Sequence, residues 1–155
     1  MSLYPGVALI TGAASGIGQA TAVSFAREGC KQVAITDLDE AGLDETARLI
    51  KDAAPQDDVQ ILQKRTNVAA EDEVTGLLDA VVEQYGRIDY AANCAGIMSN
   101  NQRSDETSIA DFDRINGVNY RGCWMTSRAE LKQMLKQEPL PTYVNGNLAQ
   151  RWKAD

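Results

Sequence analysis

The sequence predicts an α/β fold built on an open, doubly wound parallel sheet. Short apolar runs alternate with segments whose apolar residues recur at helical spacing, which is the pattern of βαβ units with right-handed crossovers. A glycine-rich turn follows the first apolar run, at the place where such folds bind ligands. At 155 residues the chain has the size of one domain, so we expect one core and no separate substrate domain.

Four buried strands are predicted from short apolar runs bounded by turn residues. They lie at residues 7–10, 33–36, 59–61 and 88–92. Three helices are predicted between the strands, because their apolar stripes have helical spacing and end at glycine or proline. These helices lie at residues 15–29, 43–54 and 74–85. The doubly wound arrangement predicts the strand order 3-2-1-4, with the ligand at the switch point between strands one and four.

The pattern changes after the fourth strand. Residues 99–108 are polar and loop-like, and apolar residues then recur at helical spacing through 109–135. This spacing predicts one long helix that ends near Pro139. Gly117 and Gly122 lie inside it and are expected to weaken it.

The last part of the chain is polar and poorly periodic, with turn-forming residues in place of a fifth strand. We therefore predict a partial sheet domain over residues 1–138 and an irregular C-terminal tail over residues 139–155. In an incomplete sheet the fourth strand is an edge with unpaired N–H and C=O groups. Aggregation or pairing with a partner is expected for such an edge.

Charge and composition exclude several classes of function. The chain carries 15 basic and 22 acidic side chains, a net charge of −7, without a run of Lys or Arg that could follow a phosphate backbone. Nucleic acid is therefore not expected as a partner. A membrane is not expected either, because no apolar stretch approaches the roughly 20 residues of a membrane helix and the first residues lack the charged region of a signal peptide. We expect a cytoplasmic protein.

The three cysteines indicate neither a metal centre nor a disulfide framework. Cys30, Cys94 and Cys123 are far apart, no Cys-x-x-Cys pair occurs, and the chain contains no His. We expect three small buried residues in a reducing compartment, and no metal site.

The glycine-rich turn between the first strand and the first helix is the strongest candidate for a binding site. A phosphate group there would meet unpaired backbone N–H groups and the positive end of the helix. Gly12 allows a tight turn, Gly16 lets the backbone approach a pyrophosphate, and Gly18 lets helix and strand pack closely. The alternative is a plain glycine-rich turn, because short glycine patterns recur by accident. The residues predicted to bind in this turn are Gly12, Ser15, Gly16, Ile17 and Gly18.

An acidic residue at the end of the second strand sharpens the prediction. Asp37 stands nineteen residues after Gly18 (37 − 18), close to the separation at which a carboxylate accepts hydrogen bonds from an adenosine ribose. A carboxylate there repels a 2′-phosphate, and no Lys or Arg occupies Ala13, Ala14 or Leu38, so NAD is favoured over NADP. The alternative for Asp37 is a solvated helix N-cap, a role that Asp39 fits better.

These motifs together resemble the short-chain dehydrogenase/reductase family. The resemblance rests on the glycine pattern, the acidic end of strand two and Asn93-Cys94-Ala95-Gly96 after strand four, and on the segments 85–90 and 111–119. It covers residues 6 to about 138 and implies a Rossmann-like, partial NAD(P)-binding domain. It further implies hydride transfer between a nicotinamide cofactor and an alcohol or carbonyl substrate. It also implies homo-oligomers that use the long helix near residues 109–137 as an interface.

The resemblance assigns roles to further residues. Asn93, Ala95 and Gly96 match the element that lines the family's cofactor crevice, with Cys94 in place of a second Asn. Asn67 and Val68 stand where the family commonly has Asp-Val to hold the adenine.

Asn119 matches an Asn that helps to hold a water in the family's proton relay. The alternative for Asn119 is a polar residue that faces a neighbouring helix. The two roles remain open at the level of the sequence.

The sequence departs from the family where the reaction centre is completed. Members carry a Ser after strand five and a Tyr-x-x-x-Lys pair, in which Lys lowers the pKa of the Tyr phenol. No tyrosine of this chain has a lysine four places on. We therefore expect a chain that retains cofactor binding and lacks catalysis, and that would use an alcohol or carbonyl substrate only if completed. The alternatives are a non-catalytic dinucleotide-binding module and an inactive truncated product.

Overall fold

The computed structural model describes residues 3–55, 58–99 and 101–140, which form one sheet of four parallel strands. The strands are β1 (Val7–Thr11), β2 (Gln32–Asp37), β3 (Gln60–Arg65) and β4 (Tyr90–Asn93). Their order in the sheet is β3-β2-β1-β4. The predicted α/β fold with an incomplete, doubly wound sheet is therefore confirmed. Of the predicted tail, residues 141–155 lie outside the described part of the chain.

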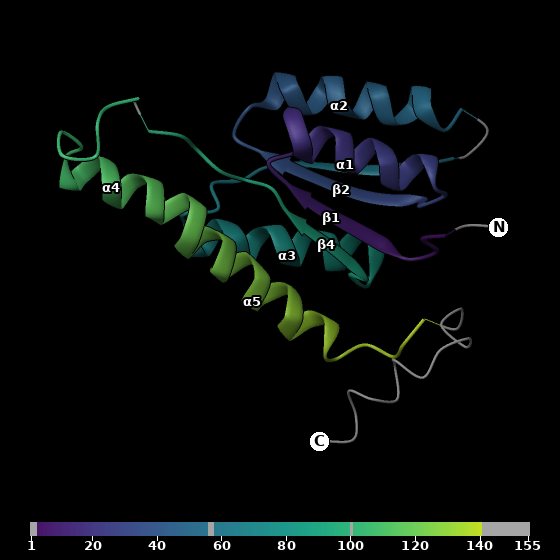
Figure 1. The fold of residues 1–155 in the computed structure, drawn as a ribbon. Coiled ribbons are helices and arrows are strands. Elements are labelled where there is room, and N and C mark those ends of the chain that lie inside the picture. The colour runs from purple at the N-terminus through teal and green to yellow at the C-terminus, as the bar shows by residue number, and fades with distance from the viewer. Residues whose placement is uncertain (1–2, 56–57, 100, 141–155) are drawn as a thin grey trace.

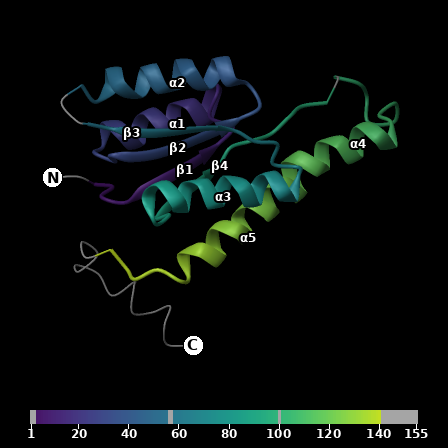
Figure 2. The ribbon, with the colours of Figure 1, turned by 180° about the vertical axis from the view of Figure 1, so that it is seen from behind.

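Helices cover both faces of this sheet. They are α1 (Gly16–Arg27), α2 (Glu40–Ala53), α3 (Glu71–Tyr85), α4 (Ile109–Asn116), the π-helical segment η1 (Gly117–Gly122) and α5 (Cys123–Met134). In Figure 1 and Figure 2, α1 and α2 form one layer, while α3 and α5 lie on the opposite side of the strands. This arrangement follows from right-handed crossovers on either side of β1.

The core consists of two apolar clusters separated by the sheet, and β1 contributes to both. Ala8 and Ile10 point toward α1 and α2, whereas Val7 and Leu9 point toward α3. All four side chains are fully buried, as expected for the central strand of a parallel sheet covered on both faces. β1 thus fixes the position of the glycine-rich turn that follows it.

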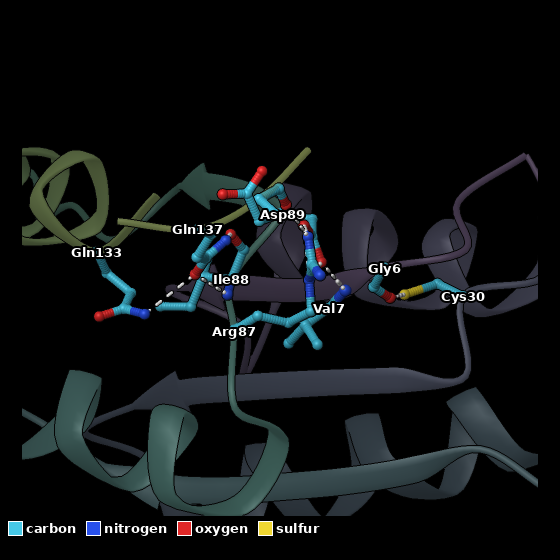
Figure 3. A network of polar contacts seen from close by, with 9 residues as sticks. Gly6, Val7, Cys30, Arg87, Ile88, Asp89, Gln133 and Gln137 are labelled. Carbon is cyan, nitrogen blue, oxygen red and sulfur yellow. Dashed lines mark hydrogen bonds and ion pairs between the residues drawn. The ribbon is translucent and has the colours of Figure 1, made fainter. Parts of the chain in front are cut away.

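Two strand boundaries differ from the prediction by two residues or more. β3 extends to Arg65, past the predicted end at residue 61, because each of its residues pairs with β2 in register although four of the six are polar. β4 begins at Tyr90, two residues later than predicted. The backbone of Ile88 is instead held by the side-chain amide of Gln137, which accepts from its N–H at 2.9 Å and donates to its C=O at 2.7 Å (Figure 3).

Figure 3 also shows how the start of β4 is fastened to β1. Asp89 accepts a hydrogen bond from the backbone N–H of Val7 at 2.9 Å and forms an ion pair with Arg87 at 2.7 Å. Arg87 in turn donates to the backbone carbonyl of Glu138, beyond the end of α5, at 3.2 Å. The edge strand and the end of the long helix are therefore tied to the same charged pair.

Helix ends are set by the residues that the sequence suggested. Asp39 caps α2 by accepting a hydrogen bond from the backbone N–H of Gly42 at 3.2 Å. Gly86 ends α3 in the left-handed conformation, with φ of 78°. Ser15 occupies the N-cap position of α1, but its side chain makes no capping hydrogen bond.

The predicted long helix is continuous but not uniform. α4, η1 and α5 follow one another without a break, and the wider π-helical turns run from Gly117 to Gly122. Gly122 packs closely, because a Cβ there would lie 3.0 Å from the backbone oxygen of Val68. Within the described residues no helix is long and apolar enough to span a membrane.

The cysteines differ from one another in burial. Cys30 is fully buried between α1 and β2, as predicted. Cys94 and Cys123 are only half-buried, which corrects the expectation of three buried thiols. Cys94 directly follows the edge strand, and Cys123 is the first residue of α5.

We predict that Gly18→Ala destabilises the fold by about 1–3 kcal/mol, because the new methyl group cannot be accommodated without moving the backbone. A Cβ at Gly18 would lie 2.0 Å from the carbonyl oxygen of Gly12. Urea unfolding followed by circular dichroism measures the change. Gly76→Ala on α3 is the matched control, since its Cβ would meet open space and alanine favours a helix interior. Equal stability of the two variants would contradict the packing argument.

Candidate functional site

A cavity of about 340 Å³ opens beyond the carboxyl ends of the strands, where the chain leaves β1, β2, β3 and β4. Its size lies at the lower end of the range for small-molecule sites. Nine of the residues predicted from the sequence line it: Gly12, Ser15, Ile17, Gly18, Asp37, Asn67, Val68, Ala95 and Gly96. The sequence interpretation missed the remaining lining residues, which are Thr36, Leu38, Thr66, Cys94, Ile97 and Val118. Most of these are direct neighbours of predicted residues, which is the signal that could have identified them.

Gly12 and Gly16 of the turn are glycines for different geometric reasons. Gly12 has φ of 66°, and a Cβ there would lie 2.6 Å from the backbone nitrogen of Ala95. Only glycine therefore lets the turn after β1 touch the turn after β4. Gly16 has φ of 54°, a backbone conformation that favours glycine, and its Cβ position faces open space. The reason for glycine here is therefore the backbone conformation and not a steric clash. Gly16 is absent from the residues that line the cavity.

The amino end of α1 faces this turn without a negative side chain of its own. The first turn of α1 contains no acidic residue, and Ser15 does not cap it through its side chain. The partial positive charge of the helix end is therefore not offset locally. An anion next to the turn would be stabilised by this arrangement.

The carboxylate of Asp37 stands opposite the glycine turn. One oxygen accepts from the backbone N–H of Ala14 at 3.1 Å, and the other accepts from Leu38 at 2.7 Å and Asp39 at 3.2 Å. Asp37 is therefore not the N-cap of α2, a position that Asp39 occupies. It joins the end of β2 to the turn after β1 and lines the cavity between them.

Asn67 and Val68 form the opposite wall of the cavity. The side-chain oxygen of Asn67 accepts from the backbone N–H of Ala69 at 3.0 Å, and its own N–H donates to Glu73 at 2.7 Å. These bonds shape the turn after β3. Val68 packs against Gly122 of the π-helical segment, which brings the long helix to the edge of the cavity.

The structure places Asn93 away from the cavity lining. Its side-chain oxygen accepts from Thr11 at 3.3 Å, and its nitrogen donates to Ser127 at 3.1 Å and to Glu130 at 2.8 Å. The side chain of Asn93 is therefore bonded to β1 and α5. Its role at a cofactor crevice stays a prediction.

Asn119 is likewise engaged with the protein itself. Its side-chain amide forms two hydrogen bonds with the backbone of Ile97, accepting at 2.8 Å and donating at 2.9 Å. It faces the segment after β4, and its role in a proton relay stays a prediction. Through these bonds Asn119 holds the stretch from Gly96 to Ile97 against the cavity.

Glu130 of α5 is a buried carboxyl group that no sequence pattern singled out. Its side chain is 3% exposed, and one carboxyl oxygen has no hydrogen-bond partner among the described residues. Burial raises its pKa to about 6, against the opposing effect of the hydrogen bond from Asn93. Within the described ranges no three His, Cys, Asp or Glu side chains cluster in a way that could hold a metal.

Comparison with known proteins identifies the family. The family model described as short chain dehydrogenase matches residues 6–139 of the chain. This chain is a member of the short-chain dehydrogenase family. The match includes the glycine turn, Asp37 and all residues that line the cavity.

Relatives in the short-chain dehydrogenase family match this chain over about half of their own length. Levodione reductase of Leifsonia aquatica is 35% identical over 131 residues, which are 84% of this chain and 48% of the relative. The 2-(R)-hydroxypropyl-CoM dehydrogenase of Xanthobacter autotrophicus is 39% identical, over 84% of this chain and 52% of the relative. The chain thus spans about half the length of the curated relatives it matches.

Solved structures of the family have the same arrangement of elements. The crystal structure of levodione reductase superposes with a TM-score of 0.82 at 34% identity, covering 86% of this chain and 51% of that one. A 3-ketoacyl-(acyl-carrier-protein) reductase from Brucella melitensis, complexed with NADH, gives a TM-score of 0.75 at 36% identity. It covers 85% of this chain and 51% of that structure. The short-chain dehydrogenase family therefore binds nicotinamide cofactors on this fold.

We predict that the raised pKa of Glu130 makes the fold less stable as the pH rises. The folded state binds this proton more tightly than the unfolded state, so the contribution is full below pH 4.5 and is lost as the pH passes about 6. The loss amounts to about 2 kcal/mol. Glu130→Gln keeps an acceptor for Asn93 without the charge, so at pH 7.5 it should melt at a higher temperature than the native chain.

Thermal unfolding measured between pH 4 and pH 8 tests this expectation. Glu83→Gln, which removes an exposed carboxylate from α3, is the control and should leave the pH dependence unchanged. A Glu130→Gln variant with the same pH slope as the native chain would show that Glu130 does not titrate in this window.

Proposed function

We propose that this chain is the nucleotide-binding part of an NAD-dependent oxidoreductase that transfers hydride between nicotinamide and an alcohol or carbonyl substrate. The observation that carries the proposal is the cavity between the glycine turn and the carboxylate of Asp37, at the switch point of the sheet. The turn and the amino end of α1 suit a pyrophosphate. Asp37 suits the hydroxyls of an adenosine ribose.

We infer that NAD is preferred over NADP. The carboxylate of Asp37 would repel a 2′-phosphate, and its neighbours Leu38, Ala13 and Ala14 offer no positive charge. The reductase from Brucella melitensis, which shares this fold, is complexed with NADH. Asn67 and Val68 would border the adenine, and Gly96 would border the path toward the nicotinamide.

In this proposal the chain binds the cofactor but does not complete hydride transfer alone. Bound NAD would supply the hydride acceptor, and the reaction also needs a positioned protein group that donates the proton. The sequence contains no Tyr-x-x-x-Lys pair, so no phenol with a pKa lowered by lysine is available. Asn119 would then act by holding Ile97 at the cavity rather than by touching substrate.

The same observation favours a second candidate, a dinucleotide-binding module without chemistry. One assay, the reduction of NAD by this polypeptide alone with a panel of alcohols, tests whether the chain performs the chemistry. Turnover would establish a complete enzyme, whereas binding without turnover fits both the module and an oxidoreductase that needs residues this chain lacks. The free thiols Cys30, Cys94 and Cys123, all within the described part of the chain, suit the cytosol as its location.

We further propose that the chain forms homo-oligomers through the exposed face of the long helix. Four large side chains along η1, α5 and the C-cap of α5 are more than half exposed and recur at helical spacing: Tyr120, Trp124, Leu131 and Leu135. The guanidinium of Arg128 lies over the ring of Trp124, 5.7 Å from its centre. An apolar stripe of this kind is typical of an interface between proteins.

Asp37→Ala is expected to weaken NAD binding by roughly tenfold to a hundredfold, since hydrogen bonds to a charged group are lost. Binding of NADP should change less, because the repulsion of its 2′-phosphate disappears as well. Titration calorimetry with both dinucleotides measures the two affinities. Asp79→Ala, on the exposed side of α3, is the control. Unchanged NAD affinity in Asp37→Ala would refute the role given to this carboxylate.

Replacing Leu131 by Glu is expected to dissociate the oligomer, because a buried charge in an apolar interface is costly. Sedimentation velocity should show a larger species for the native chain and monomers for the variant. Met98→Glu changes an exposed apolar residue in the segment after β4 and should keep the native distribution. A native chain that is monomeric at all concentrations would count against the interface.

A further inference from the structure

The glycine turn is held from behind by two side chains that do not line the cavity. Gln19 of α1 donates from its side-chain nitrogen to the carbonyl oxygen of Ala14 at 3.3 Å. Thr46 of α2 donates from its hydroxyl to the carbonyl oxygen of Ala13 at 2.8 Å. We call these two residues, Gln19 and Thr46, the rear bracket.

The rear bracket is a closed hydrogen-bond network. The side-chain nitrogen of Gln19 also donates to the hydroxyl oxygen of Thr46 at 2.9 Å, so one residue orients the other. The hydroxyl of Thr46 lies 2.9 Å from the carbonyl oxygen of Gly42 as well, one turn earlier in α2. Thr46 is fully buried, and inside a protein such a network is stronger than in water.

The backbone N–H groups of Ala13 and Ala14, on the other side of the turn, have fixed partners as well. The backbone N–H of Ala13 donates to the carbonyl of Thr36 at 3.1 Å, and that of Ala14 donates to Asp37 at 3.1 Å. All four polar backbone atoms of Ala13 and Ala14 therefore have fixed partners, two on β2 and two on the rear bracket. The turn has little freedom to rotate its peptide planes.

Close packing brings α2 near enough to make these bonds. A Cβ at Gly42 would lie 2.7 Å from the Cβ of Ala14 and 2.8 Å from its carbonyl oxygen. Because Gly42 has no side chain, the first turn of α2 lies directly against the back of the glycine turn. Thr46, one helical turn later, then reaches Ala13.

The orientation of one peptide group follows. The C=O of Ala14 points toward Gln19, and in a trans peptide the N–H of the next residue points the opposite way. That N–H belongs to Ser15, which lines the cavity. If the peptide turned over, a carbonyl oxygen would replace this donor and repel an anion.

We propose that Gln19 and Thr46 are positioning residues for the cofactor, which fix the amides of the glycine turn in the direction that binds a pyrophosphate. The inference rests on the proposed function. A turn that is already ordered spends no binding free energy on ordering, so the rear bracket raises affinity without touching the ligand. The proposal predicts that the affinity for NAD depends on two side chains on the far side of the turn.

The test uses the 155-residue chain and NAD, with Thr46→Val and Gln19→Leu as variants of similar shape. Each should bind NAD about two- to tenfold more weakly in calorimetry, the effect of one or two lost hydrogen bonds. Amide exchange, followed by mass spectrometry, should become faster in the peptide that contains Ser15 and Gly16. Thr46→Ser keeps the hydroxyl and should restore both properties.

Thr126→Val is the matched control. Thr126 is also fully buried, and its hydroxyl donates to the carbonyl of Gly122 at 2.9 Å, within the long helix. It should cost a comparable amount of stability with unchanged NAD affinity and unchanged exchange at Ser15. If Thr46→Val and Thr126→Val bind NAD alike, or if exchange at Ser15 is the same in both, the inference is overturned.

Failure of the proposed function gives a different result. A native chain that produces no heat with NAD removes the proposed function and the inference together. A native chain that binds normally while the rear-bracket variants bind equally well removes the inference alone.

Discussion

The site depends on contact between backbones at the first turn of the chain. The Cβ position of Gly12 is occupied by the turn after β4, and that of Gly18 is occupied by Gly12 itself. No side chain fits at either position, so β1, β4 and α1 meet through their main chains. Such contacts are short and leave no rotamer to adjust, which fixes the turn relative to both strands. The cavity, the position of Asp37 and the approach of α2 all follow from this constraint.

At the edge of the sheet, side-chain amides form the backbone hydrogen bonds that a neighbouring strand would otherwise form. Gln137 bonds to both polar atoms of Ile88, and Asn119 bonds to both polar atoms of Ile97. Between these two points lies β4, which among the described residues pairs with β1 on one side only. Gln137, just after the end of α5, thus holds the edge strand at its start, and Asn119 of the long helix holds it just beyond its end. This explains how a strand at the edge keeps its place beside the cavity.

The burial of a polar side chain on α5 carries an energetic cost. Asn93 is satisfied by Thr11, Ser127 and Glu130, but Glu130 keeps one oxygen without a partner among the described residues. A carboxyl group in that position favours its neutral form, as its raised pKa shows. The hydrogen bond from Asn93 of β4 to α5 therefore places a titratable group in the interior.

The sequence by itself determined the fold class, the strand order and the location of the glycine turn. Alternating periodicity depends only on local burial, and glycines at positive φ or at close contacts cannot be replaced, so both are visible in the residues. The position of Asp37, nineteen residues after Gly18, is likewise a matter of chain length between two elements. Nine of the predicted residues accordingly line one cavity.

Tertiary structure alone decided where the long polar side chains point. Asn119 finds its partner 22 residues away, and Asn93 finds its partner Ser127 34 residues away, so no local pattern indicates these bonds. The same holds for Glu130 and for the rear bracket of Gln19 and Thr46, which belong to different helices. An amide or hydroxyl takes whichever partner the packing brings within reach, and that is decided only when distant segments meet.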